Sequence, residues 1–318
     1  MRVEPVSRSD SGRYAHILSC PGCSGKLAGL EDGFACKACG TVYPTAAIGP
    51  VDLRLKQSRT YPLALRIGQA APSLDGKLFS DLPPNPTPDI ADWKFDNIDE
   101  DYHTGNRITP ELVSYFPRAT GPDQWMLDLG CGHRQLETFC RDKTGFNYIG
   151  MDHDGHYPHL LGDAHALPFR DQSLDFILSV AVLEHLAFPD IALAEIARVL
   201  RPGGRFIGTV AFLETFHMDS HYHMTHLGTA RLLDTAGLEL VVMAPNRQWS
   251  GLQAMAKMAL YPGLPDFAKK LAVGPAEALS NALVGLKRKF KPGSSISELE
   301  HLSTTTGGFR FAAQKPAA

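Results

Sequence analysis

The most constraining feature of this sequence is an alternation of apolar runs and helical stretches that begins at Gln124. Each apolar run has the length of a buried strand, and stretches with helical spacing lie between and after the runs. Such alternation predicts an α/β fold, in which helices cover both faces of a parallel sheet. The predicted strands are Trp125–Leu129, Tyr148–Met151, Phe176–Val180 and Arg205–Val210, and the predicted helices are Gln135–Lys143, Ile191–Leu200 and Thr229–Ala236.

The rest of the chain divides by texture into three further parts. Residues 15–54 are turn-rich and hold four of the six cysteines, and residues 55–106, with a proline cluster, are predicted to be a connector or lid. Residues 107–318 contain the alternating pattern, with a helical insertion at about 250–305 that prolines such as Pro275 should interrupt. The sequence therefore predicts a small N-terminal unit, a connector and one large domain.

Composition excludes several classes of protein. The 318 residues include 31 basic and 34 acidic side chains, so a formal net charge of −3 gives no global attraction to nucleic acid or anionic membranes. No uncharged apolar run approaches the roughly 18 residues of a membrane span, and Met1–Arg13 lacks the apolar core of a secretory signal. Few, unevenly placed cysteines predict a reduced, cytoplasmic location.

Four cysteines form two CxxC pairs, Cys20 with Cys23 and Cys36 with Cys39. This spacing lets four thiolates close tetrahedrally on one zinc ion. Such a site leaves no open coordination position, so the expected Zn²⁺ is structural.

A glycine-containing turn follows the first predicted strand. Gly130 and Gly132 allow the backbone to turn sharply and approach a ligand, and Asp152 ends the next strand, 22 positions after Gly130. That spacing suits a carboxylate that hydrogen-bonds a ribose diol. A dinucleotide dehydrogenase would require a third glycine where the chain has Gln135.

The ordered motifs resemble the class I S-adenosylmethionine-dependent methyltransferases from about Gln124 to Val242. Beyond the LDLGCG run, the motifs are Leu161–Phe169, Ser173–Leu186 and Glu195–Phe206. The resemblance implies a Rossmann-like seven-stranded sheet whose antiparallel last pair is Leu238–Ala244 and Gly308–Gln314.

The resemblance also implies roles for single residues in binding S-adenosyl-L-methionine. The methionine end of the cofactor would contact Asp128, Gly130 and Gly132, and its ribose would contact Asp152. Its adenine would contact Asp163 and Ala164, and its sulfonium would lie beside Val180 and Ala181. One position departs from the family pattern, because Arg134 stands where a third glycine is usual. Arg134 would either point into solvent or contact the methionine carboxylate.

The cysteine segment resembles the zinc ribbons that precede some methyltransferases, including the Trm112-like type. Related ribbons bind proteins or RNA, so this resemblance fixes no substrate.

Three histidines are candidate catalytic residues. His185 follows a predicted strand at the edge where ligands bind in such sheets, and His217 and His221 follow the next strand in a loop with four histidines in ten residues. Each has an alternative: a cofactor-side histidine for His185, and a polar pocket wall for the loop. A metal site in the loop is a weaker interpretation, because the spacing is not diagnostic.

Three functions compete for the whole chain. The leading one is methyl transfer to an oxygen or nitrogen atom of a small or medium-sized metabolite. RNA methylation is the second, but Lys26 and Lys37 are the only basic residues from Ile17 to Asp52. The third is a non-catalytic cofactor-binding or activator protein, supported only by Arg134.

The insertion allows two interpretations. We expect a helical cap over the acceptor site, and the alternative is a helix at a membrane surface. The segment Lys269–Lys291 holds six basic residues and one acidic residue.

Overall fold

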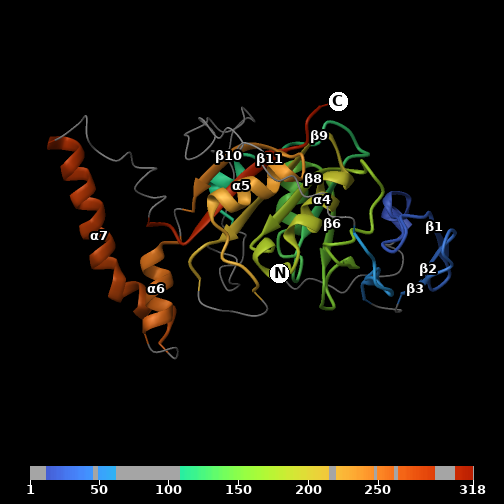
Figure 1. Ribbon diagram of the computed structural model, residues 1–318, viewed down its shortest axis with the longest axis horizontal. Helices are drawn as coiled ribbons and strands as arrows, with labels where there is room; N and C mark the ends of the chain where they lie inside the picture. Colours follow the sequence, from blue (N-terminus) through green and yellow to red (C-terminus); the bar gives the residue numbers. More distant parts are fainter. Residues whose placement is uncertain are drawn as a thin grey trace.

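The computed structural model describes residues 12–45, 49–61, 108–214, 220–246, 249–260, 264–290 and 305–317. Most of the predicted connector and His217 fall outside these ranges. The described chain is a large twisted sheet with helices on both faces, a small sheet at one end and a helical pair at the other (Figure 1). The predicted α/β class is therefore confirmed.

The large sheet has eight strands in the order β10-β11-β9-β8-β5-β6-β7-β4. All neighbouring strands are parallel except β11, which is antiparallel to both β9 and β10. The strands are β4 (Val51–Asp52), β5 (Trp125–Leu129), β6 (Asn147–Asp152), β7 (Leu160–Leu161), β8 (Leu174–Val180), β9 (Leu200–Ala211), β10 (Glu239–Pro245) and β11 (Gly308–Gln314). The antiparallel last pair is confirmed.

The prediction of seven strands is one too few. The additional strand β4 comes from the segment just after the cysteine unit, and its two residues pair with β7. Leu53 extends this contact, because its backbone amide donates to the Leu161 carbonyl at 2.8 Å.

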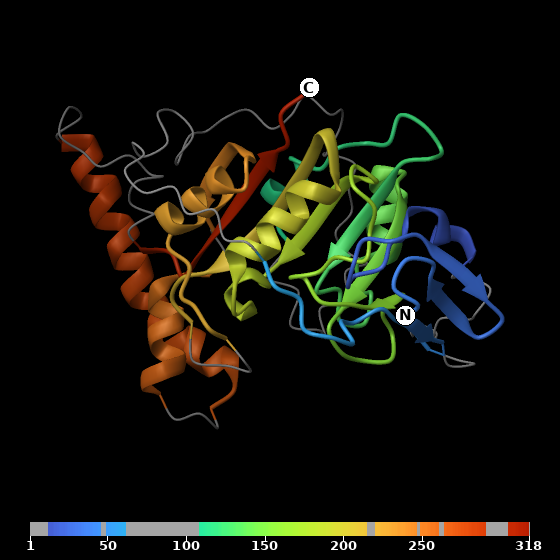
Figure 2. The ribbon, with the colours of Figure 1, turned by 45° about the vertical axis from the view of Figure 1, so that its right-hand side comes forward.

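Helices cover both faces of this sheet (Figure 2). α4 (Pro189–Val199) and α5 (His226–Thr235) lie on one face, and α2 (Pro110–Val113) and α3 (Glu137–Thr144) on the other. Pro189 at the first turn of α4 and the Thr225 side chain at the start of α5 favour helix initiation there. A 3₁₀ turn, η3 (Leu183–His185), follows β8.

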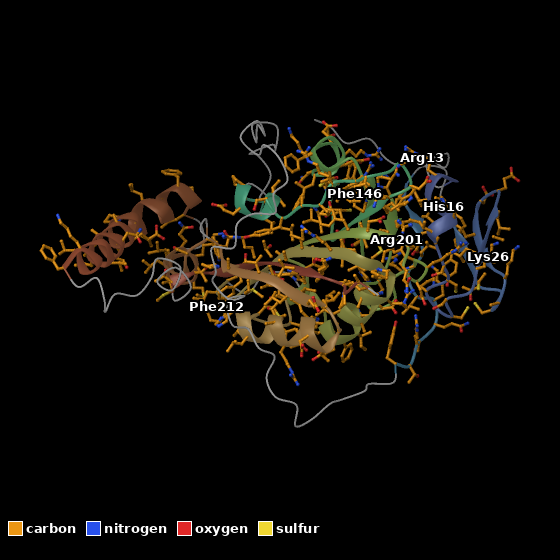
Figure 3. All side chains as sticks on the ribbon, turned by 90° about the horizontal axis from the view of Figure 1, so that it is seen from above. Arg13, His16, Lys26, Phe146, Arg201 and Phe212 are labelled. Carbon is orange, nitrogen blue, oxygen red and sulfur yellow. The ribbon has the colours of Figure 1, made fainter. Side chains whose placement is uncertain are left out.

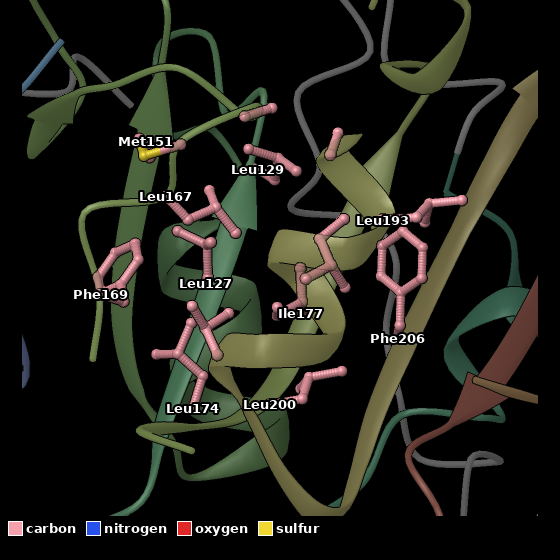
Figure 4. Packing of buried hydrophobic residues seen from close by; sticks show 14 of the residues in the cluster. Leu127, Leu129, Met151, Leu167, Phe169, Leu174, Ile177, Leu193, Leu200 and Phe206 are labelled. Carbon is pink, nitrogen blue, oxygen red and sulfur yellow. The ribbon is translucent and has the colours of Figure 1, made fainter. Parts of the chain in front are cut away.

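Two hydrophobic clusters lie on opposite faces of the sheet, because successive side chains of a strand point to opposite faces. Leu127 and Ile177 join the cluster beneath α4 and α5 (Figure 4), whereas Met126 and Phe176 join the cluster beneath α2 and α3. Cys140, on α3, is fully buried in the second cluster.

The small sheet holds β1 (Leu27–Leu30), β2 (Gly33–Cys36) and β3 (Val42–Pro44), after a 3₁₀ turn, η1 (Ala15–Ile17). Its core is continuous with that of the large sheet, since Leu18, Phe34 and Tyr43 belong to the same buried cluster as Leu160 and Phe169. The cysteine unit therefore packs firmly on the large sheet.

The described residues of the insertion are helical, as predicted, and form α6 (Gly251–Ala259) and α7 (Asp266–Phe290). The expected interruption at Pro275 is wrong, because Pro275 lies inside α7, which runs without a break for 25 residues. Phe212, just after β9, lies toward this helical pair, and Arg201, near the start of β9, lies toward the small sheet (Figure 3). The insertion thus emerges on the side where β9 ends.

Candidate functional site

The turn after β5 gives the site its floor. Gly130 has φ of +73°, and a Cβ there would lie 2.4 Å from a methyl carbon of Val182. Gly132, with φ of +52°, has no heavy atom within 4 Å of its would-be Cβ, so it borders open space. Glycine is required at position 130 by this close approach and favoured at both positions by φ.

Asp152 lies directly beside this turn, at the carboxyl end of β6. Its Oδ2 accepts a hydrogen bond of 2.8 Å from the Gly132 amide, and its Oδ1 accepts one of 2.7 Å from the His153 amide. Because β5 and β6 are adjacent and parallel, Gly132 and Asp152, 20 positions apart in sequence, meet at one edge of the sheet. The structure brings together the two features from which the sequence predicted a nucleoside site.

Asp163 follows β7 at the same edge and is held by a histidine. The Phe188 amide donates to Nε2 of His165 at 3.1 Å, so Nδ1 carries the proton that faces Asp163 Oδ1 at 2.6 Å. Burial acts to raise the pKa of Asp163, but hydrogen bonds from the His165 ring and backbone outweigh it and lower the pKa. Asp163 is thus a well-held anion, and Ala164 is buried beside it.

Asp128 lies beneath the turn rather than on its open side. Its carboxyl group is buried, and the Tyr148 hydroxyl donates to Oδ2 at 2.6 Å. Burial raises the pKa of Asp128 to about 7, although the bond from Tyr148 acts to lower it. This carboxyl group can therefore hold a proton near neutral pH.

The end of β8 supplies the next wall. Val180 ends the strand, and Ala181 adopts φ of +55°, a strained conformation for a residue with a Cβ. The Ala181 amide donates to the Thr209 carbonyl at 3.1 Å, which fixes the strained residue between β8 and β9. Backbone strain of this kind gathers at ligand sites.

Glu184 connects this wall to the histidine-rich loop, a role that the sequence did not reveal. Its carbonyl accepts hydrogen bonds from the His221 and Tyr222 amides at 2.7 and 3.1 Å, and its buried Oε1 accepts one from the Ala211 amide at 3.3 Å. His221 is exposed, and His185 lies in η3, next to Glu184. The only signal in the sequence was its place beside His185.

Comparison with known proteins identifies the large domain. Residues 127–208 match the family described as "Methyltransferase domain". The chain therefore resembles methyltransferases over these residues. The match spans β5 to β9, the strands that carry the site.

Individual relatives match only part of the chain. A probable S-adenosylmethionine-dependent methyltransferase of Mycolicibacterium smegmatis is 31% identical over 142 residues, which are 39% of this chain and 54% of the relative. A fatty-acid O-methyltransferase of the same organism is 35% identical over 121 residues, 33% of this chain and 44% of the relative. The chain spans about half the length of these curated relatives.

One solved structure resembles the chain more distantly. It is a complex between the Haloferax volcanii Trm112 methyltransferase activator and a putative methyltransferase. The matched chain of that complex is 19% identical in sequence, and the match covers 64% of this chain and 87% of the matched chain, with a TM-score of 0.42.

Arg134, the departure from the methyltransferase pattern, turns inward. The predicted solvent orientation is wrong, since the side chain is 7% exposed. Its NH1 donates to Glu137 Oε2 at 2.8 Å and lies 3.0 Å from Nε2 of His159. Arg134 packs behind β6, where Gly150 leaves room for its stem.

The four predicted metal ligands, Cys20, Cys23, Cys36 and Cys39, come together, with all sulfur atoms within 4.8 Å of one another. The Sγ–Sγ distances are 3.8 Å for Cys20–Cys39 and 3.5 Å for Cys23–Cys36. Four thiolates about 2.3 Å from a tetrahedral zinc ion would stand about 3.8 Å apart. Amides of Ala38 and Cys39 point at Cys36 Sγ, at 3.4 and 3.5 Å. This cluster fits zinc.

Proposed function

We propose that the protein transfers the methyl group of S-adenosyl-L-methionine to an oxygen or nitrogen atom of a small or medium-sized metabolite. The observation that carries this proposal is the contact between Gly132 and Asp152 across β5 and β6. This contact supports the proposal because the glycine turn and the carboxylate that would bind the ribose lie at one edge of the sheet, within the residues that match a methyltransferase domain.

The cofactor would lie along the carboxyl ends of four strands. Asp152 would accept hydrogen bonds from the ribose hydroxyls, and Asp163 with Ala164 would meet the adenine. The turn with Gly130 and Gly132, above the buried Asp128, would hold the methionine end. The Val180–Ala181 wall would lie beside the sulfonium.

Catalysis would rest mainly on positioning. The sulfonium would lose its methyl group readily, because a neutral thioether would be the leaving group. Holding the acceptor atom in line would therefore supply most of the rate enhancement, since positioning lowers the barrier by up to roughly 7–11 kcal/mol in intramolecular models. A hydroxyl or ammonium acceptor must also lose a proton, and a general base adds about 10²–10⁴-fold. We propose His217, His221 or His185 for that proton. The His221 and Tyr222 amides donate hydrogen bonds to the Glu184 carbonyl, and these bonds hold this part of the loop next to η3.

An oxygen acceptor on an apolar molecule is the substrate class that one matched relative supports. The matched fatty-acid O-methyltransferase acts on such a molecule according to its name. The cysteine unit has only two lysines, Lys26 and Lys37, and Glu31 and Asp32 balance their charge, which argues against an RNA-gripping surface.

The cofactor proposal is tested by titrating S-adenosyl-L-methionine into the full chain in a calorimeter. Asp152→Ala should weaken binding by at least about tenfold, because a hydrogen bond to a charged group contributes roughly 1.5–3 kcal/mol. Asp154→Ala removes an exposed carboxylate two residues away and should bind as the unmodified chain does. An unmodified chain that does not bind the cofactor would refute the proposal.

A second experiment measures methyl-transfer turnover of the full chain with a library of metabolite acceptors. His217→Ala and His221→Ala should lower turnover without weakening cofactor binding, and His223→Ala is the matched control from the same loop. Unchanged turnover in both variants would remove the loop histidines as bases and leave His185.

A further inference from the structure

Helix α7 packs on the protein with its more polar side. Its partly buried positions include Val273, Glu277, Ser280 and Val284, which recur at the spacing of one helix face. The Glu277 carboxylate accepts a hydrogen bond from Ser250, the residue that caps α6. This side of α7 therefore rests on α6.

The opposite side of α7 is apolar and open. Six large side chains are 54–75% exposed: Phe267, Leu271, Leu279, Leu283, Leu286 and Phe290. At 100° per residue they span about 160° of the helix. Among the α7 positions that the structure describes as exposed, Lys289 is the sole charged residue. Monomeric proteins rarely expose so continuous an apolar face without a partner.

Basic residues stand at both ends of this helix. Lys269 and Lys270 lie near its start and Lys287–Lys289, a run that includes Arg288, near its end. Asp266–Phe290 has five basic and two acidic residues, a net charge of +3 in a chain of net charge −3. Its one internal carboxylate, Glu277, is turned toward α6. The helix that carries the open face therefore has a net positive charge, with basic residues near both of its ends.

We propose that α7 binds an anionic phospholipid bilayer, with its apolar face in the acyl–headgroup boundary and its terminal lysines and arginine on the headgroups. No helix in the described part of the chain is long and apolar enough to cross a membrane. A helix with one apolar face and basic residues near its ends would lie in the plane of the bilayer. A second copy would bring two helices of net charge +3 together, which disfavours dimer formation. A cap over the acceptor site would bury this face, whereas its leucines are more than half exposed.

The test is co-sedimentation of the full chain with vesicles. The anionic vesicles contain phosphatidylcholine with about 30% phosphatidylglycerol, whose negative surface potential attracts basic segments. They should bind the chain at least about tenfold more strongly than vesicles of pure phosphatidylcholine. The double variant Leu279→Glu/Leu283→Glu should lose at least about tenfold of that binding, because each leucine forfeits its burial. Circular dichroism checks that the variant keeps its helices.

The matched control is Leu30→Glu/Val42→Glu, which makes the same charge change at two exposed apolar residues of the small sheet. It should bind vesicles as the unmodified chain does. Equal binding by both double variants, or none by the unmodified chain, would overturn the proposal. A dimer in light scattering that only Leu279→Glu/Leu283→Glu dissociates would assign the face to a second copy instead.

Discussion

Arg134 adopts φ of +56° where the methyltransferase resemblance expects glycine. The left-handed conformation costs a residue with a Cβ about 1–2 kcal/mol, and the ion pair with Glu137 and the packing on Gly150 offset this cost. The arginine is therefore a structural residue behind the site, and its presence leaves the glycine turn itself intact.

Two substitutions at position 134 separate these effects. Arg134→Ala loses the ion pair and retains the backbone strain, whereas Arg134→Gly loses the ion pair and relieves the strain. We expect the alanine variant to be less stable than the glycine variant by about 1 kcal/mol in urea unfolding. Both variants should bind S-adenosyl-L-methionine within about threefold of the unmodified chain. A large loss of affinity in both, without a change in stability, would instead place Arg134 at the cofactor.

Asp128 should make stability depend on pH. Its pKa is raised to about 7 in the folded chain but is near 3.9 in an unfolded one. The folded state thus retains a proton that the unfolded state releases between these values. The stabilising contribution of this carboxyl group is complete below about pH 4 and is lost as the pH rises through 7.

Asp128→Asn should remove that dependence while the Tyr148 hydroxyl still finds an acceptor. The unfolding free energy of the unmodified chain should fall, relative to that of the variant, as the pH rises from 5 to 7. The slope cannot exceed about 1.4 kcal/mol per pH unit. Urea unfolding at several pH values measures it, with Asp154→Asn as the control at an exposed carboxylate. Parallel profiles for Asp128→Asn and the unmodified chain would show that Asp128 titrates normally.

At the scale of elements, the central strands could be predicted because their residues are apolar without interruption. β5 is buried at all five positions, and its sequence bounds match the prediction. β4 and β7 have two residues each and no pattern of their own, so only pairing with neighbours defines them. α7 continues through Pro275 because the carbonyl left without a partner belongs to Leu271, at an exposed position open to water.

The site divides in the same way. The glycine turn and Asp152 could be predicted, because adjacent parallel strands bring their carboxyl ends together. The contact of Arg134 with His159 joins residues 25 apart, and that of Glu184 with His221 joins a 3₁₀ turn to a loop. No local pattern encodes such tertiary contacts, so they required the structure.

At the scale of the whole molecule, the cysteine unit is bound into the sheet that carries the site. The Ser19 amide donates to the Pro168 carbonyl at 3.0 Å, and the Arg170 amide donates to the Ile17 carbonyl at 2.9 Å. Phe169 lies between these two contacts and is fully buried, five residues beyond Ala164, which we propose to contact the adenine. Order in the cysteine unit should therefore support the segment after β7.

This coupling predicts that removing zinc destabilises the methyltransferase domain and not the small sheet alone. Four-thiolate sites supply folding free energy directly, so chelation should shift the thermal midpoint of the whole chain down by about 5–10 °C, as a loss of a few kcal/mol would. Tryptophan fluorescence reports the large sheet and its contact with the cysteine unit, because Trp125 lies in β5 and its ring centroid is 5.6 Å from that of His16. Cys36→Ser should reproduce the shift and Lys37→Ser, its exposed neighbour, should not. A purified chain without one equivalent of zinc would contradict the metal assignment, whereas an unchanged fluorescence midpoint after chelation would show that the two units unfold independently.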